Sequence, residues 1–425
     1  RSLRVLVSAA THRAIANVLV RVARELRGAG IEPPLRVVKL VGRGSEADRE
    51  AEAAGVELVD DDKLATVLAE SDAANLPVVV GSTVWSLWKR MKAASADAEE
   101  GAEEIPISPM FDVVVIDEAS QMKVPDALIA LSSIRPGGRV LMCGDDRQLA
   151  PIVRGRYDAD NTLFGSVFAH FAARFGRLAL RESRRMNRAL ADYPRRTFYP
   201  GLVSMVPERR IAVSEGATAG TEPLDALLRE TFLRPEDSVV LCTYGGYTAT
   251  ARNPFEAHLA AHVATLARAE LRDAAGEPFT AAGFREQALA ILSPHRAQNS
   301  AILHELAARG WAYGELPVVD TVERMQGNER EMIIVSYAVS DREYAEREAE
   351  FLLDPHRFNV SITRPRSKLI VLMSEEILRA LPREERVMTE SMALKGYVDQ
   401  PWREVREITL SAPDGAEVRV TVRVR

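Results

Sequence analysis

The chain has 425 residues, enough for two or three domains of ~100–200 residues each. Hydrophobic residues make up 47% and charged residues 27%, as in soluble globular proteins, and no apolar run approaches the ~20 residues that cross a bilayer. The net charge of −6 argues against a passive basic nucleic-acid binder but allows a local basic groove. Cys143 and Cys242 lie far apart beside apolar runs, so we expect buried free thiols, a cytoplasmic location and no membrane contact.

Short apolar runs alternate with long stretches of helical period along the chain. We expect strands at Leu3–Ser8, Val78–Gly81, Val113–Ile116, Val140–Cys143, Val239–Thr243, Ala288–Ser293, Met332–Ser336 and Leu369–Met373. Most of them are apolar throughout, as in parallel sheets that are covered on both faces. The pattern therefore predicts an α/β fold laid out twice, with the second round beginning near residue 180.

The expected domain boundaries follow from that doubling. We expect one α/β domain over residues 1–178, a second over 179–380 and a C-terminal extension over 381–425. In the extension, Ile408–Leu410 and Val418–Val424 flank Pro413-Asp414-Gly415, which predicts a hairpin at a sheet edge or at the start of another domain. Residues 96–104 are acidic and small, which is typical of a solvated loop, and 209–222 have the character of a flexible connection.

Two carboxylates, Asp117 and Glu118, directly follow the apolar run Val113–Ile116. Open α/β sheets bind their ligands at the carboxyl ends of the strands, and NTP hydrolysis needs a metal-binding carboxylate beside one that handles water. Asp117 is the candidate to hold Mg²⁺ through water, and Glu118 is the candidate to orient or deprotonate the attacking water. The alternative is a strand that ends in an ordinary polar turn.

The next apolar run leads into Cys143-Gly144-Asp145-Asp146-Arg147-Gln148-Leu149-Ala150-Pro151. Gly144 permits a tight turn, and Gln148 would face the same crevice as Asp117. An amide in that crevice can sense the γ-phosphate and relay its presence to bound nucleic acid. The alternative is a plain loop between a strand and a helix.

These segments resemble conserved motifs of superfamily 1 helicases, in the group of the nonsense-mediated-decay and Okazaki-fragment helicases. Asp117–Gln121 is similar to motif II and Gly144–Pro151 to motif III. The other resemblances follow in family order: Val5–Asn17 (motif Ia), Gly81–Thr83 (Ib), Ser183–Met186 (IV), Ser293–Gln298 (before V), Val319–Glu329 (V) and Arg357–Arg364 (VI). The resemblance covers roughly residues 1–375. It implies two RecA-like parallel-sheet domains of the P-loop NTPase fold, with ATP and Mg²⁺ in the cleft between them.

The resemblance also implies roles in the second domain. Arg185 and Arg364 become candidate catalytic residues, because a guanidinium suits the charge that develops on a transferring phosphoryl group. Arg357 lies seven residues before Arg364, two helical turns, so both are expected to point at one surface. Gln326, Gly327 and Glu329 would turn a loop beside the nucleotide, with Glu329 contacting its sugar or an arginine. The alternative for each arginine is a surface ion pair.

The implied nucleic-acid contacts are small donors at strand ends and loop starts. Thr11, His12, Thr83 and Thr321 suit hydrogen bonds to successive phosphates of a single strand. Trp85 and Trp88 have indole rings on which bases can stack. Their spacing of three residues is more typical of a helix core, and that is the reading we favour for both.

The chain contains no Gly-x-x-x-x-Gly-Lys-Ser/Thr, the loop that wraps nucleotide phosphates. We therefore expect an N-terminally truncated first domain whose activity requires that missing region, or a motor subunit with its P-loop elsewhere. Arg184 stands where the family has an aromatic residue, Met325 where it has Phe, and Pro365 where it has a small helix former.

The function expected from these motifs is an ATP-dependent helicase or translocase on single-stranded nucleic acid, DNA rather than RNA, travelling 5′→3′. Protein partners or nuclease domains, if any, would lie outside this chain. One alternative is a nucleic-acid-binding scaffold that keeps the fold without hydrolysis. Another is a helicase–nuclease fusion, although no Glu-x-Lys nuclease signature occurs here.

Overall fold

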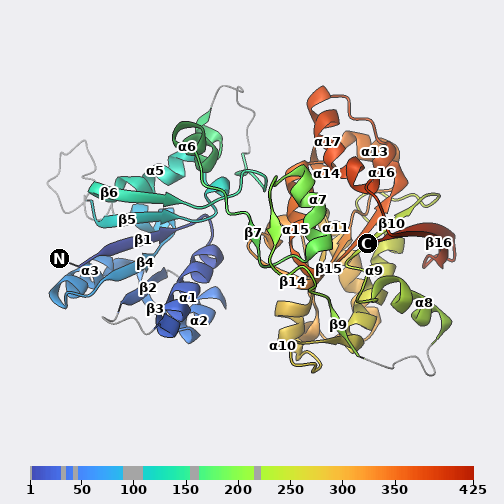
Figure 1. Cartoon of the computed structure of the whole chain (residues 1–425), viewed down its shortest axis with the longest axis horizontal. Helices are drawn as coiled ribbons and strands as arrows, with labels where there is room; N and C mark the ends of the chain where they lie inside the picture. Colours follow the sequence, from blue (N-terminus) through green and yellow to red (C-terminus); the bar gives the residue numbers. More distant parts are fainter. Residues whose placement is uncertain (1, 30–34, 42–45, 90–108, 154–161, 215–221) are drawn as a thin grey trace. The chain divides into compact units, whose positions relative to one another are not determined.

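A computed structural model describes the chain except for residues 1, 30–34, 42–45, 90–108, 154–161 and 215–221. The chain forms two compact units, Arg1–Leu178 and Ala179–Arg425, and each is treated by itself below (Figure 1). The acidic stretch 96–104 and residues 215–221 of the expected connection lie outside the described residues. Within the described residues, every helix is too short or too polar to cross a membrane.

The first unit is built on a six-stranded parallel sheet in the order β3-β2-β4-β1-β5-β6. Its strands are β1 (Arg4–Ser8), β2 (Arg36–Val41), β3 (Glu57–Asp60), β4 (Val78–Gly81), β5 (Phe111–Ile116) and β6 (Ile134–Met142). Four of these correspond to strands expected from the sequence, whereas β2 and β3 were not predicted. Lys39 interrupts the apolar run of β2, and it is buried there because it pairs with the Asp48 carboxylate.

Helices cover both faces of this sheet (Figure 1). One apolar cluster packs α1 (His12–Ala29) and α2 (Glu46–Ala53) against one face, through residues such as Ile15, Leu19 and Ala51. A second cluster packs α3 (Leu64–Ala73), α5 (Val124–Ser132) and α6 (Val167–Phe175) against the other. This two-sided cover explains why β4 and most positions of β1 and β5 are apolar.

Cys143 is exposed, which corrects the expectation that both thiols are buried. Among the described strands, β6 has a neighbour on one side only, and Val140 and Leu141 on it are also exposed. An apolar run thus marks a strand without telling whether that strand is central or at an edge. Cys242, on a central strand of the second unit, is buried, and both cysteines are free.

The second unit has a seven-stranded sheet in the order β13-β12-β14-β15-β10-β17-β16. The parallel strands are β10 (Val239–Tyr244), β12 (Leu289–Leu292), β13 (Val318–Asp320), β14 (Arg330–Ser336) and β15 (Pro365–Ser374). The hairpin β16 (Glu404–Ser411) and β17 (Glu417–Val424) joins antiparallel to β10. Residues 381–425, set apart above as an extension, are therefore part of this unit.

Helices again cover both faces of the second sheet. The main apolar core contains α8 (Pro223–Phe232), α9 (Pro254–Glu270) and α11 (Arg296–Ala308). A second group of helices, α7 (Arg188–Thr197), α15 (Pro355–Thr363) and α17 (Glu385–Val398), packs together through Tyr193, Phe358 and Tyr397. The shorter elements are β7 (Glu182–Ser183), β8 (Val203–Ser204), β9 (Ala212–Val213), β11 (Leu271–Arg272), α10 (Ala281–Gly283), α12 (Val322–Met325), α13 (Arg342–Arg347), α14 (Ala349–Leu352) and α16 (Glu375–Arg379).

Candidate nucleotide and nucleic-acid sites

The turn that follows β5 carries the two candidate carboxylates of the first unit. The Asp117 amide still belongs to the sheet, because it donates to the Ser8 carbonyl at 2.9 Å. Glu118 then adopts the left-handed conformation, with φ of 47° and ψ of 39°, which costs a non-glycine residue about 1–3 kcal/mol. Its carboxylate accepts a hydrogen bond from the side-chain amide of Gln121 at 3.0 Å. A strained residue at the end of a buried strand is typical of a functional turn.

The loop after β6 holds this turn in place. The Ala119 amide donates to the Cys143 carbonyl at 2.8 Å, just beyond the last strand pair. Gly144 makes the approach possible, since a methyl group there would lie 2.9 Å from the Ser120 amide nitrogen and 3.0 Å from the Phe168 ring. Gln148 is oriented by Asp145, whose carboxylate accepts from its side-chain amide at 2.8 Å. The two motifs thus form one backbone-bonded unit.

Asp117 is a partly buried carboxylate, and burial raises its pKa above the ordinary value. Among the described residues, no lysine or arginine lies within ion-pair distance of it. A carboxylate in this state fits a divalent cation, because Mg²⁺ is commonly held by one or two carboxylates together with water and substrate phosphates. The described part of the chain contains no cluster of three metal-binding side chains, so a protein-only metal cage is not what this turn offers.

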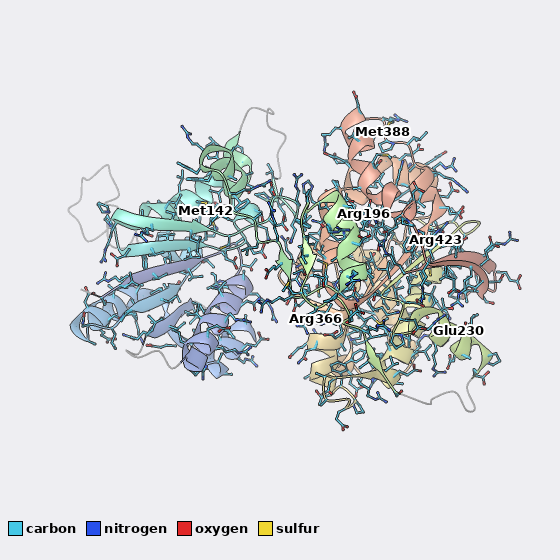
Figure 2. The ribbon with its side chains drawn as sticks, viewed as in Figure 1. Met142, Arg196, Glu230, Arg366, Met388 and Arg423 are labelled. Carbon is cyan, nitrogen blue, oxygen red and sulfur yellow. The ribbon has the colours of Figure 1, made fainter. Side chains whose placement is uncertain are left out.

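Arg185 lies at the centre of an ion-pair cluster in the second unit. Its guanidinium donates to Glu329 and, at 3.1 Å, to the Thr363 carbonyl at the end of α15. Arg366, labelled in Figure 2 at the start of β15, donates to the same Glu329 carboxylate at 2.8 Å. Burial alone would raise the pKa of Glu329, but Arg185 and Arg366 outweigh it and lower that pKa. From the sequence, Glu329 was expected to contact the nucleotide sugar or an arginine that was not named; the structure pairs it with Arg185 and with Arg366, which the sequence analysis missed.

Arg364, the other candidate phosphate-contacting arginine, is only 2% exposed. Its guanidinium donates to the Val360 carbonyl at 3.2 Å and to the Thr363 hydroxyl at 3.2 Å. Helix α15 ends at Thr363 and Pro365 opens β15, so the proline removes no hydrogen bond from the helix. The expectation that Arg364 and Arg357 point at one surface is not met in this structure, because Arg364 points into the protein.

Arg357 is held by acidic and aromatic neighbours. It donates to Glu323 at 2.7 Å and to the Phe351 carbonyl at 2.7 Å, and its guanidinium lies 4.1 Å from the Phe351 ring centre. Burial would raise the pKa of Glu323, but the charge of Arg357 lowers it. This geometry is an ion pair beside a stacked aromatic ring, and the Arg357 side chain is only 16% exposed, so it differs from the surface ion pair that was the alternative for each arginine.

The loop between α12 and β14 turns at Gly327, whose φ of +76° favours glycine. The preceding residue, Gln326, has a buried side-chain nitrogen without a hydrogen-bond partner among the described residues. Such a group costs free energy unless a ligand or water satisfies it. Met325, which stands where the family has Phe, is buried at 1% exposure and fills that apolar position.

Two nucleic-acid candidates of the first unit, Thr11 and Thr83, cap the helices that follow β1 and β4. The Thr11 hydroxyl accepts from the Ala14 amide at 3.2 Å at the start of α1, and Thr83 does the same for Ser86 at 3.2 Å. Each hydroxyl keeps its own hydrogen for another acceptor. Burial, followed by the charge of Lys39, lowers the pKa of the neighbouring His12. In the second unit, Thr321 precedes α12 and its amide donates to Asp320 at 2.8 Å.

The two tryptophans do not form a core pair. Val84 and Leu87 are the buried residues of that helical turn, at 5% and 1% exposure, whereas Trp85 is 60% exposed and Trp88 is half-buried. The core reading favoured above is therefore wrong for Trp85. Val84 and Leu87, which have the same spacing of three residues, occupy the buried positions instead.

Comparison with known proteins agrees with the motif resemblance. Two family models, each described as an AAA domain, match residues 160–376 and 47–192. The "Regulator of nonsense transcripts 1 homolog" of Arabidopsis thaliana is 25% identical over 72% of this chain and 23% of its own length. The "DNA polymerase alpha-associated DNA helicase A" of Schizosaccharomyces pombe is 28% identical over 62% of this chain and 37% of its own length. A solved structure titled "Complex structure of Arterivirus nonstructural protein 10 (helicase) with DNA" covers 87% of this chain and 54% of its own at 12% identity and a TM-score of 0.36, which is too low to carry an argument.

The first of the AAA-domain models covers more than half of the chain, so the chain belongs to the AAA-domain family. Within it, the chain is a superfamily 1 helicase domain with two RecA-like units, distantly homologous to the nonsense-transcript regulators and the polymerase-associated helicases. It spans about a quarter of the length of the first curated relatives. Members of this family are in general ATP-hydrolysing helicases.

Proposed function

We propose that this chain is the motor of an ATP-dependent translocase that moves 5′→3′ along single-stranded DNA. The observation that carries the proposal is the strained Glu118 turn, tied by backbone hydrogen bonds to the loop that bears Gln148. A backbone conformation that costs free energy and is held by a second loop is typical of catalytic and ligand-binding sites. The family's general activity supplies the reaction class, which is ATP hydrolysis coupled to movement on nucleic acid.

Each candidate residue has a role in this proposal. Asp117 would hold Mg²⁺ through water, and Glu118 would orient or deprotonate the attacking water. Bound Mg²⁺ neutralises charge on the transferring phosphate. Gln148, held by Asp145, would report the γ-phosphate to the strand-binding loops. Arg185 and Arg364 would stabilise the charge that develops during transfer, and Gln326, Gly327 and Glu329 would line the nucleotide.

The choice of DNA and of direction rests on relatives. The Schizosaccharomyces pombe relative is by its printed name a DNA helicase associated with DNA polymerase alpha, whereas the Arabidopsis relative is a regulator of nonsense transcripts. The 5′→3′ direction follows from the resemblance to their group. Neither choice rests on a local residue.

A hydrolysis assay on the full-length gene product tests the proposal. Glu118→Gln should leave nucleotide affinity nearly unchanged and slow DNA-stimulated hydrolysis by ~10²–10⁴-fold, because removal of a general base has that effect. Glu25→Gln is the matched control, since Glu25 is 67% exposed and, among the described residues, forms an ion pair with Arg21 on the same helix. Hydrolysis near the wild-type rate in Glu118→Gln would show that Glu118 is a structural residue of the turn, and an absence of hydrolysis in the wild type would favour the scaffold alternative.

Partial duplexes test the substrate and the direction. Strand displacement should require a single-stranded 5′ tail, and a DNA tail should support it better than an RNA tail of the same sequence. Displacement that requires a 3′ tail would reverse the proposed polarity. A preference for RNA tails would place this chain with the transcript regulators.

A further inference from the structure

We infer that Trp85 is a stacking platform for a base of the single strand, beside phosphate contacts made by Thr11 and Thr83. This inference deepens the proposed function and rests on it. It assigns an exposed residue that the family motifs leave without a role, and it predicts how the strand is gripped regardless of base sequence.

The first step concerns why the indole faces outward. The helical turn from Val84 onward buries Val84 and Leu87, which lie on one side because they are three residues apart. Trp85 follows Val84 by one residue, about 100° around the helix, so it faces away from the core. At 60% exposure it leaves much of a large apolar ring in water. An exposed indole ring offers a flat apolar face on which a base can stack.

The second step concerns its surroundings. Strands β1 and β4 are parallel neighbours in register, with Val7 opposite Gly81, and the Ser82 amide extends that pairing to the Val7 carbonyl at 3.0 Å. The segments that follow these strands, Ala9–His12 and Ser82–Trp85, therefore both begin at the carboxyl ends of β1 and β4. Gly81 brings α1 close, since a methyl group there would lie 2.4 Å from the Leu19 side chain.

Asp61 holds the second of these segments. Its carboxylate accepts from the Ser86 hydroxyl at 2.8 Å, next to Trp85. The two segments thus combine two threonine hydroxyls that cap helices, a histidine and an exposed indole. Hydroxyl and imidazole donors suit phosphate oxygens, and an indole suits the face of any base. The ligand is single-stranded nucleic acid, read by backbone and stacking.

The test separates bases from phosphates. The 425-residue chain and its variants are titrated into labelled dT12 and into an equally long strand of abasic residues, with anisotropy as the readout. Wild type should bind dT12 more tightly, and Trp85→Ala should lose about 5- to 100-fold for dT12 but little for the abasic strand. Trp85→Phe should keep most of the difference. Phe175→Ala, the truncation of another aromatic residue that is 74% exposed in the first unit, should change neither affinity.

Acrylamide quenching gives an independent readout. Of the four tryptophans, Trp85 is the most exposed, because Trp311 is buried under Arg268 and both Trp88 and Trp402 are half-buried. Quenching should therefore fall on addition of dT12, not of the abasic strand, and this response should vanish in Trp85→Phe.

The outcomes distinguish failure of the proposed nucleic-acid function from failure of the stacking role of Trp85. If the chain binds neither strand, the proposed nucleic-acid function fails together with the inference. If it binds both strands equally, or if Trp85→Ala binds dT12 as wild type does, only the stacking platform is overturned. If Trp85 in the full-length gene product is shielded from acrylamide before any strand is added, it packs against protein and the inference is overturned.

Discussion

The candidate carboxylates of the first unit and the candidate arginines of the second are held in opposite ways. Asp117 and Glu118 are placed by backbone, through the end of β5, a strained turn and the loop after β6. Arg185 and Arg357 are placed by ion pairs with Glu329 and Glu323, and Arg364 by the Val360 carbonyl and the Thr363 hydroxyl of the helix before it. Carboxylates fixed by backbone are ready for a ligand, whereas arginines fixed by side chains must exchange a partner to reach one.

The cost of that exchange differs among the arginines. The Arg185 side chain is 32% exposed, and ion pairs in such surroundings contribute ~0–1 kcal/mol. Arg364 is 2% exposed, so it must leave a buried place as well as its hydrogen bonds. Among the candidate arginines, Arg185 would therefore lose the least by leaving its present partners for a phosphate.

The largest expected effect tests this difference. Arg185→Ala should slow DNA-stimulated hydrolysis by the full-length gene product by ~10³–10⁵-fold, the range for an arginine that stabilises phosphoryl transfer. Its melting temperature should change little, because its ion pair is partly exposed. Arg185→Lys should not restore the rate, since an ammonium lacks the guanidinium fork.

Arg364→Ala is the companion variant. It should lower the melting temperature as well as the rate, because a buried side chain and its hydrogen bonds are lost. A lost rate with an unchanged melting temperature would instead identify Arg364 as a phosphate-contacting residue. Normal hydrolysis in Arg185→Ala would break the comparison and move the role to Arg357 or Arg364.

A second prediction concerns a carboxylate of the second unit that is held by neutral groups. Glu256 is buried and accepts from the Tyr244 hydroxyl at 2.5 Å, the Ser336 hydroxyl at 2.6 Å and the Ala338 amide at 2.9 Å. Burial raises its pKa to about 7 from an ordinary value of 4.5. The folded state thus holds a proton that the unfolded state releases, so this stabilisation is complete below pH 4.5 and is lost as the pH rises through about 7.

Urea unfolding of wild type and Glu256→Gln from pH 4 to pH 8 measures that loss. The free energy of unfolding of wild type should fall relative to the variant by about 3 kcal/mol over this range, since one pKa unit corresponds to about 1.4 kcal/mol. Glu329→Gln serves as the contrast, because arginines lower the pKa of Glu329 and its contribution is lost only as the pH falls. Parallel curves for wild type and Glu256→Gln would show that Glu256 does not titrate there.

The smallest expected effect lies in the first unit. Gly144→Ala should destabilise that unit by about 1–3 kcal/mol, because the added methyl group meets the Ser120 amide and the Phe168 ring. Gly28→Ala is the control, since within the described part of the chain Gly28 has open space where the methyl group would be added. Chemical denaturation with a probe in the first unit gives the difference. Equal stability of both variants would mean that the two loops are not held as tightly as the backbone geometry indicates.

The sequence by itself determined the repeated α/β layout, because runs such as Val239–Thr243 and Met332–Ser336 are apolar on both faces and parallel strands covered by helices require that. It also placed the carboxylate turn, since residues adjacent in the chain stay adjacent in space. Strand β2 was missed because its buried lysine looks polar until Asp48 is brought beside it.

Only the tertiary structure decided the partners of charged and aromatic side chains. Arg366 and Glu329 are 37 residues apart in the chain, and strand pairing brings them together. The burial of Arg364, the exposure of Cys143 and the outward face of Trp85 depend likewise on which neighbours the fold supplies. Local residue patterns record the period of an element, whereas exposure and pairing are set by contacts between residues far apart in the chain.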